Sequence, residues 1–208
     1  IYLNKDLNIE YHLIEDVLVA EDRQKDLKRL KLSNILIGNY LAYLFSKEFK
    51  QFKWFNVIYD FNDKKKNWPK FSKNAGKKMY TGGTVTYLAL QLAYYMGFKR
   101  IFIIGMDHHY KINREQILQK GSNILLSKGK DINHFNDKYF GKGYRWHVPR
   151  TDRMLKAYKK SMIYFNQKKI KVFRVSQEKN RQLPFKHISE RKFYEMLLQS
   201  NIKHKMVV

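Results

Sequence analysis

The sequence predicts an α/β fold in which a mainly parallel sheet carries helices on both of its faces. Short apolar segments of strand length alternate along the chain with longer segments whose apolar residues recur at helical spacing. Residues 100–107 form a continuous apolar run, which is typical of a strand covered on both faces. The 208 residues suit one domain better than two, so we expect a single domain over residues 1–208.

The expected strands are short and apolar. The first ends in acidic residues, the second is closed by a glycine, and the third alternates between apolar and polar side chains. Together they are predicted at 11–16, 35–38, 56–61, 100–107 and 169–176. Residues 40–55 are aromatic and fit either a helix or a loop, whereas the polar and basic stretch 62–78 predicts a loop.

The helices are predicted from apolar residues that share one face. In the segment 85–96 these are Val85, Leu88, Ala89, Leu92 and Met96, and Gly97 follows as a C-cap residue. The segment 148–167 has Pro149 in its first turn, and its inner face holds Met154, Leu155, Tyr158, Met162 and Phe165. A charged helix is expected at 21–32 and a final helix at 190–199. The weakly patterned segment 111–146 predicts a mobile insertion that serves as an active-site loop.

The composition excludes several classes of site. The chain has no cysteine, which excludes disulfides, thiolate metal sites and cysteine nucleophiles and fits a cytoplasmic protein. It has no run of about eighteen apolar residues that could span a bilayer. Its formal net charge of +24 suits nucleic acid, an anionic membrane surface or anionic small substrates. Lys, Asn, Ile, Tyr and Phe are also abundant in proteins from AT-rich genomes, so the charge alone selects none of these partners.

Polar residues follow the expected strand at 100–107. Ligands of α/β sheets bind beyond the carboxyl ends of the strands, where Gly105 permits close backbone approach. Asp107, His108 and Tyr110 bring polar groups to the same edge. They predict a substrate-binding or phosphate-binding corner, and the alternative is a polar turn that only ends the strand.

A glycine pair precedes the helix expected at 85–96. The backbone amides of Thr81, Gly82, Gly83 and Thr84 could cradle a phosphate or carboxylate at the helix N-terminus. Many helices begin with such residues for capping alone, so both interpretations stay open.

Basic and aromatic residues alternate before the helix expected at 148–167. This loop suits an anionic substrate because amides at a helix N-terminus carry partial positive charge. The residues expected to contact substrate are His134, Lys142, Tyr144, Arg145 and Trp146.

His147 is the candidate general base. It lies about two residues ahead of the expected helix start, where positive potential disfavours imidazolium and keeps the ring able to accept a proton. The alternative is that His147 caps the helix. His108 and His134 could suggest a metal, but no third ligand has suitable spacing, so no metal site is predicted.

Three stretches of the chain resemble a known bacterial family. Residues 81–98, 103–110 and 134–154, with Ile14-Glu15-Asp16 near the start, are similar to a family often labelled a domain of unknown function. Its members are frequently encoded with surface polysaccharide enzymes. The similarity covers most of the chain and weakens after about Ser176.

That family is similar in turn to the Campylobacter-type sialyltransferases of glycosyltransferase family 42. There a helix, a Gly-X-Asp strand end with a following tyrosine, and a His-x-x-x-Thr-Asp segment recur in the same order. Here the last segment corresponds to residues 147–152. The resemblance implies a Rossmann-like, single-domain glycosyltransferase variant of the fold. It also implies His147 as the catalytic base and Tyr110 as a ligand of the donor phosphate.

The resemblance further implies the substrates. The donor is a CMP-activated nonulosonic acid, bound by residues 81–84, Gly105, Asp107 and Tyr110, and the acceptor is a glycan or glycolipid contacted by residues that include Asp16 and His108. Neither a metal nor a cofactor takes part, and the anomeric carbon is inverted. The acceptor places the protein in the cytoplasm or at the inner membrane, where an anionic membrane face would attract its positive charge.

The chain departs from these relatives at its start. They begin with a strand and a Gly-Asn-Gly-Pro-Ser-Leu turn that holds the nucleotide, followed by an Asn before the segment equivalent to Ile1-Tyr2-Leu3. Neither is present here, and the chain opens without Met. We therefore expect that the N-terminal strand and Gly-rich turn are missing, either from a fragment or because the donor half comes from elsewhere.

Two other functions fit parts of the sequence. A related branch of the family contains archaeal enzymes that pyrophosphorylate 6-hydroxymethyl-dihydropterin with ATP and magnesium, for which Asp16 and Asp107 would supply carboxylates. A basic nucleic-acid-binding protein would use residues 64–66 and 77–78 as phosphate contacts. The basic residues are spread through the whole sequence without a single stripe or known binding module, which argues against nucleic acid.

Overall fold

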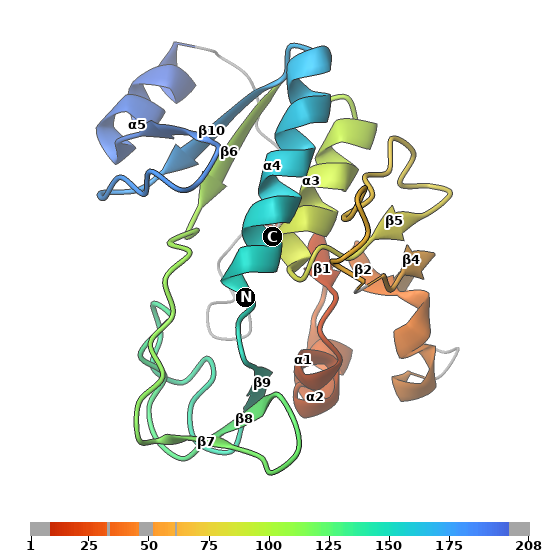
Figure 1. Cartoon of the computed structure of the whole chain (residues 1–208), viewed down its shortest axis with the longest axis vertical. Coiled ribbons are helices and arrows are strands. Elements are labelled where there is room, and N and C mark those ends of the chain that lie inside the picture. The colour runs from red at the N-terminus through yellow and green to blue at the C-terminus, as the bar shows by residue number, and fades with distance from the viewer. Residues whose placement is uncertain (1–8, 33, 46–51, 61, 200–208) are drawn as a thin grey trace. The chain divides into compact units, whose positions relative to one another are not determined.

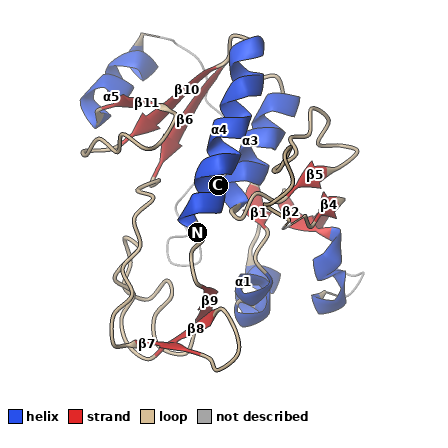
Figure 2. Ribbon diagram, viewed as in Figure 1, coloured by secondary structure: helices blue, strands red, loops and turns tan. Residues whose placement is uncertain are grey.

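The computed structural model describes residues 9–32, 34–45, 52–60 and 62–199 of the chain. Within these ranges the protein is a mixed α/β structure whose strand pairs are mostly parallel, which confirms the predicted fold class (Figure 2). The chain forms two compact units. The first unit consists of Ile1–Trp54 and His109–Arg150, and the second of Phe55–His108 and Thr151–Val208. The predicted start at Ile1-Tyr2-Leu3 lies outside the described residues.

The first unit contains two three-stranded sheets. One has the order β1-β2-β3, from β1 (His12–Ile14), β2 (Ile35–Gly38) and β3 (Phe52–Phe55), with β1 and β2 parallel. Helices α1 (Val17–Asp22) and α2 (Gln24–Arg29) and the 3-10 helix η1 (Asn39–Leu44) accompany it. The other sheet is antiparallel and has the order β7-β8-β9, from β7 (Gln116–Leu118), β8 (Ile124–Ser127) and β9 (Arg145–His147) (Figure 1).

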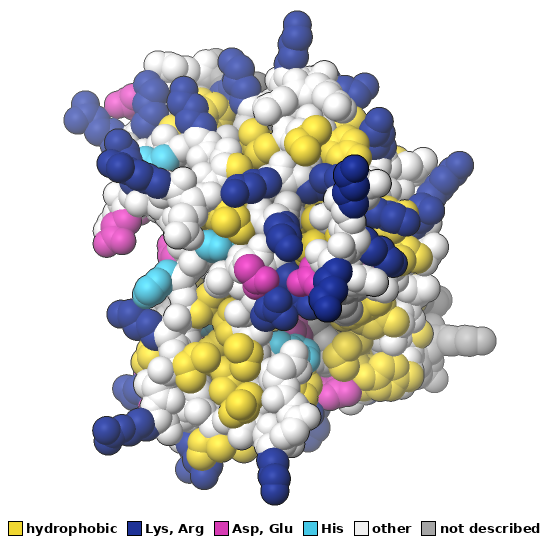
Figure 3. All heavy atoms as spheres, viewed as in Figure 1, with side chains coloured by type: hydrophobic (Ala, Val, Ile, Leu, Met, Phe, Trp, Pro, Cys, Tyr) yellow, Lys and Arg dark blue, Asp and Glu magenta, His cyan; other side chains and the backbone are white. Residues whose placement is uncertain are grey.

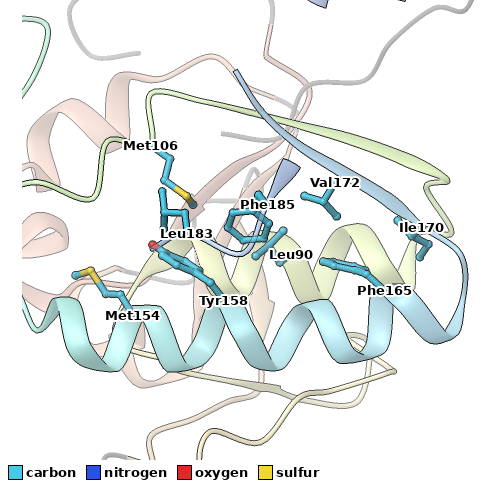
Figure 4. Packing of buried hydrophobic residues seen from close by; sticks show 9 residues of the cluster. All are labelled: Leu90, Met106, Met154, Tyr158, Phe165, Ile170, Val172, Leu183 and Phe185. Carbon is cyan, nitrogen blue, oxygen red and sulfur yellow. The ribbon is translucent and has the colours of Figure 1, made fainter. Parts of the chain in front are cut away.

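The second unit contains a parallel sheet of order β11-β10-β6, from β6 (Arg100–Ile104), β10 (Lys171–Val175) and β11 (Lys186–Ile188). A parallel pair, β4 (Val57–Ile58) and β5 (Met79–Tyr80), leads into α3 (Val85–Tyr95). The chain then runs through α4 (Thr151–Gln167) and ends in α5 (Glu190–Leu198). The core lies between α3, α4 and β10, where Leu90, Tyr158, Phe165 and Val172 pack together (Figure 4).

Two predicted helices begin elsewhere than expected. The charged helix predicted at 21–32 starts earlier, at Val17, because Asp16 caps it, and it is interrupted at Arg23, whose backbone leaves the helical region (φ −111°, ψ 17°). The helix predicted at 148–167 starts later, at Thr151, so Pro149 lies ahead of the helix rather than in its first turn. Helix 85–96 and strands 35–38 and 169–176 are confirmed to within a few residues.

Other expectations differ in degree. The strand expected at 56–61 is limited to β4, and Phe61 lies outside the described residues. Strand β6 ends at Ile104, which is 63% exposed, and none of its residues is buried, so the expected cover on both faces is wrong. It is also an edge strand of its sheet. The weakly patterned segment 111–146 contains β7, β8 and the start of β9, whose pairing depends on cross-strand contacts rather than on local pattern. The described residues contain no helix long and apolar enough to cross a membrane.

Helix α3 is joined to the loops around β5 by one buried amide. Gln91 is fully buried, and its Oε1 accepts hydrogen bonds from the backbone N–H of Ser72 (3.0 Å) and of Tyr80 (3.1 Å). Its Nε2 donates to the carbonyl oxygens of Tyr80 (2.9 Å) and Tyr87 (3.1 Å). The side chain therefore satisfies polar backbone groups that would otherwise be buried without partners.

Gln91→Leu is expected to lower the free energy of unfolding by about 2–4 kcal/mol, because the N–H groups of Ser72 and Tyr80 both lose their acceptor. Urea unfolding followed by circular dichroism measures this. The control is Val85→Ala on the exposed side of the same helix, which is expected to change stability by less than about 1 kcal/mol. Equal effects of the two substitutions would show that Gln91 is not the joint described above.

Candidate functional site

Asp16 and His147 form a carboxylate–imidazole pair in the first unit. Asp16 is the N-cap of α1, and its Oδ1 accepts from the N–H groups of Leu18 (2.7 Å) and Val19 (3.2 Å). Its Oδ2 lies 2.9 Å from His147 Nδ1. A carboxylate only accepts hydrogen bonds, so the proton sits on Nδ1 and the neutral ring carries a lone pair on Nε2. Nε2 makes no hydrogen bond to any described residue, and the His147 side chain is 39% exposed.

The pKa of His147 is raised above its usual value. The hydrogen bond to Asp16 raises it most, burial lowers it, and the negative charges of Asp16 and Glu15 raise it further. The sequence predicted the opposite direction, from the positive end of the following helix. That helix begins four residues later, at Thr151, and helix-end potential fades within about one turn, so the carboxylate at 2.9 Å dominates.

Glu15 is a buried carboxyl beside this pair. Its pKa is raised to about 7, mainly by burial and further by the neighbouring charge of Asp16, while His147 opposes the shift. Glu15 follows strand β1 directly and is 9% exposed. The hydroxyl of Tyr40 donates to its backbone carbonyl. The charge of Asp16 therefore acts on the pKa of both Glu15 and His147, where β1 meets α1.

Arg145 attaches strand β9 to helix α1. Its Nε donates to Asp22 Oδ1 (2.9 Å), its Nη2 to Glu21 Oε2 (2.8 Å), and its backbone N–H to Asp22 Oδ2 (2.8 Å). The sequence predicted that Arg145 contacts an anionic substrate. In the structure two carboxylates balance its charge, and it holds the strand that carries His147.

The loop before β9 is organised by Asp131. This carboxylate is buried and accepts from His134 Nδ1–H (2.7 Å) and from the N–H groups of Phe140 (2.9 Å) and Asn133 (2.8 Å). Trp146 is also buried and stacks on Phe140. His134 and Trp146, both predicted to contact substrate, line the same small pocket.

Lys142 and Tyr144 line a separate, larger groove of the first unit, with a volume of about 770 Å³. The guanidinium of Arg23 lies 4.3 Å from the Tyr144 ring centroid and also donates to the carbonyl of Tyr139. Lys142 is exposed. The groove thus brings together two residues that the sequence singled out.

The segment before α3 has defined local contacts. The N–H of Thr81 donates to the carbonyl of Ile58 (3.2 Å), and Thr81 is buried. Thr84 is the N-cap of α3, and its Oγ1 accepts from the N–H of Thr86 (3.3 Å). A Cβ at Gly82 would lie 2.5 Å from Tyr87, and Gly83 has a positive φ of 80°, so packing and backbone conformation both require glycine here. An anion at these amides stays a prediction.

The strand end after β6 is a strained turn of the second unit. Gly105 (φ 75°) and His108 (φ 55°) both adopt positive φ. Asp107 is exposed, and its carbonyl accepts from Asn180 Nδ2 (3.2 Å). His108 packs edge-on against Tyr158 at 5.8 Å, and burial lowers the pKa of His108.

Sequence reasoning missed several residues around these sites. Asp22 holds strand β9 through Arg145, and Arg23 holds the loop before β9 through the carbonyl of Tyr139. Glu15 interacts with His147. Each of these partners lies more than a hundred residues away in the sequence, so no local pattern indicates them. In the second unit the buried Arg174 donates from Nη1 to the carbonyl of Met106 (3.3 Å) and so fixes the strand end at 105–108. A lone arginine within an apolar strand was the available signal for Arg174. The side chain of Tyr110, which the resemblance implies as a ligand of the donor phosphate, is 38% exposed.

The family assignment follows from a comparison with family models. The model described as 6-hydroxymethylpterin diphosphokinase MptE-like matches residues 9–113, which is just over half of the chain. The chain belongs to this family. No curated protein and no solved structure matches it.

The family match covers some of the site and not the rest. Within the MptE-like region lie Asp16, the segment 81–84 and the strand end at 105–110. His147 and the loop that carries Lys142 lie beyond it. The match gives no evidence for a sialyltransferase specifically, so that part of the resemblance stays a prediction. No group of three His, Cys, Asp or Glu residues in the described ranges is arranged to hold a metal ion.

The raised pKa of Glu15 predicts a pH-dependent stability. A carboxyl that binds its proton more tightly in the folded than in the unfolded state stabilises the fold at low pH, and this is lost as pH rises through about 7. Glu15→Gln removes this effect. We expect equal stability of the two proteins near pH 4.5 and, at pH 8, a variant more stable by up to about 3 kcal/mol.

Urea unfolding of both proteins across this pH range measures the difference. Glu178→Gln, at an exposed position, is the control for loss of one carboxylate and should show a much smaller difference. A pH-independent gap between wild type and Glu15→Gln would contradict the raised pKa.

Proposed function

We propose that this protein is a glycosyltransferase of the sialyltransferase-like kind, which transfers a nonulosonic acid from a CMP-activated donor to a hydroxyl of a glycan or glycolipid. The single observation that carries the proposal is the Asp16–His147 pair. A carboxylate on Nδ1 leaves Nε2 free to take a proton from a hydroxyl, which is the task of a general base in transfer to an alcohol. The resemblance of residues 147–152 to the His-x-x-x-Thr-Asp segment supports the same role.

In this mechanism His147 Nε2 accepts the proton of the acceptor hydroxyl as its oxygen bonds to the anomeric carbon of the donor. The bond from that carbon to the phosphate oxygen breaks, and CMP leaves with the electron pair. Asp16 stabilises the imidazolium that forms and keeps its orientation. Attack opposite the leaving phosphate inverts the anomeric carbon.

The proposed donor contacts are the amides of residues 81–84, Gly105, Asp107 and the hydroxyl of Tyr110. The proposed acceptor contacts are His108, His134, Lys142, Tyr144 and Trp146. In this proposal Arg145 positions strand β9 and does not bind the substrate, because its charge is balanced by Asp22 and Glu21. The acceptor would be reached in the cytoplasm or at its membrane face, and no separate cofactor takes part.

The second candidate function is transfer of diphosphate from ATP to a pterin hydroxyl, which the description of the MptE-like family favours. The same His147 would serve as base, since this reaction also attacks with a hydroxyl. Magnesium would require carboxylate oxygens near the phosphates. Asp16 fits this poorly, because one oxygen accepts two amides and the other accepts from His147. That use of the carboxylate supports the glycosyltransferase over the diphosphokinase.

A nucleic-acid-binding role has less support. Lys and Arg side chains are spread over the face shown in Figure 3 and do not gather into one stripe. A distributed charge of this kind favours anions in general and not a duplex of defined geometry.

The deciding experiment is a ligand panel measured by calorimetry with CMP, CMP-sialic acid, ATP and a pterin alcohol, with and without magnesium. Metal-independent binding of the two cytidine ligands is the expected result. Magnesium-dependent binding of ATP with the pterin would replace the proposal by the diphosphokinase. The same panel on a chain extended upstream tests whether a preceding segment contributes to donor binding.

Substitutions at the pair test the mechanism. His147→Ala is expected to lower kcat by about two to four orders of magnitude while donor affinity stays nearly unchanged, because only the proton acceptor is lost. Turnover by wild type should rise with pH above the usual histidine range, since Asp16 raises the pKa of His147. Asp16→Asn should lower kcat and move this rising limb to lower pH. A limb that does not move would remove His147 as the titrating base.

A further inference from the structure

The groove of about 770 Å³ in the first unit has a volume typical of small-ligand sites. It is lined by Glu115 and by residues of the loop that joins β8 to β9. Four lysines line it, together with Tyr144 and the exposed side chain of Ile132. Its two acids are Glu115 and Asp137.

The groove carries unbalanced positive charge. Lys130 forms an ion pair with Asp137 (3.1 Å). Lys128, Lys138 and Lys142 are exposed and form no ion pair with any residue that the structure describes. Glu115 is the remaining acid in the lining, so the groove keeps an excess of two positive charges. Exposed lysines that converge on a concave surface raise the local concentration of anions.

Backbone hydrogen bonds hold the walls of the groove in place. The N–H of Lys128 donates to the carbonyl of Glu115 (2.7 Å), and the N–H of Asp131 to that of Asp137 (2.8 Å). The N–H of Gly143 donates to the carbonyl of Ser127 (2.8 Å). The lysines therefore project from a defined backbone, so a ligand has to order their side chains but not the loop that carries them.

The groove is close to the proposed base along the chain. Tyr144 lines the groove and directly precedes β9, whose last residue is His147. Three residues in extended conformation span about 10 Å. Arg23 fixes Tyr144 from the side of α1 and α2, and Asp16 fixes His147 from the N-cap of α1. The groove and His147 are thus about one short strand apart along the chain, and this is the separation that a substrate seated in the groove has to span.

We propose that this groove binds a phosphate-bearing saccharide and that it thereby selects the acceptor of the reaction. This inference rests on the proposed function, because it assigns the groove to the substrate whose hydroxyl His147 deprotonates. The three unpaired lysines bind the phosphate, and Tyr144 packs against the sugar. A neutral saccharide of the same size gains only the contact with Tyr144 and Ile132, so it binds more weakly.

The test compares lactose with lactose carrying one phosphate ester as calorimetric ligands for the full chain, at low and moderate salt. The wild type is expected to bind the phosphorylated sugar at least tenfold more tightly, and this preference should shrink as salt rises. The variant Lys128→Gln/Lys138→Gln/Lys142→Gln should lose the preference. The matched control is Lys99→Gln/Lys168→Gln/Lys179→Gln, which removes the same charge from exposed positions of the second unit and should keep the preference.

Three outcomes would overturn the inference: no preference for the phosphorylated sugar in the wild type, equal loss in both triple variants, or groove substitutions that affect only binding to vesicles containing phosphatidylglycerol. The last would assign the groove to a membrane surface. Transfer from CMP-sialic acid onto each sugar, measured separately, tests the proposed function. If transfer is absent although the phosphate preference holds, the glycosyltransferase proposal fails. If transfer occurs without the preference, only the role of the groove fails.

Discussion

The carboxylate of Asp16 caps helix α1 with one oxygen and holds the imidazole of His147 with the other. Because the cap fixes the carboxylate relative to β1 and α1, the ring of a residue 131 positions later takes a defined orientation. Strand β9 is held to the same helix by Arg145, through Glu21 and Asp22. The first unit thus has a polar junction whose loss would release both the helix start and the candidate base.

This junction has an electrostatic consequence. The pKa of Glu15 is raised to about 7, mainly by burial, and that of His147 is raised mainly by its hydrogen bond to Asp16. A base with a raised pKa is a stronger proton acceptor once it is neutral, but a larger fraction of it is protonated near neutral pH. Burial of Glu15 limits the negative charge around the ring, because a protonated Glu15 adds no field. The arrangement sets the proton affinity of His147 by burial and by charge together.

The MptE-like family and the proposed transfer share a chemical requirement. Transfer of a diphosphate to a pterin alcohol and transfer of a sugar to a glycan hydroxyl both need an anionic nucleotide bound on one side and a hydroxyl activated on the other. The family match includes Asp16, which caps α1, and the strand end at 105–110. His147 and the groove of about 770 Å³ lie beyond the matched residues.

The sequence by itself determined the parts whose signals are local. The extent of helix α3, the glycine after it and the apolar runs of β2 and β10 each depend on neighbouring residues, and the structure confirms them. The predicted apolar face of α3 holds for Leu88 and Leu92, but Val85 is exposed. Only the tertiary structure decided the site. The start of α1 follows from the local cap by Asp16, but the hydrogen bond of Asp16 to His147 and the attachment of β9 to Asp22 join residues more than a hundred positions apart. The raised pKa of His147 depends on the first of these contacts. The lysines give a second example. The sequence shows how many there are, but only the fold of the loop decides that Lys130 is paired with Asp137 and that other lysines line a groove.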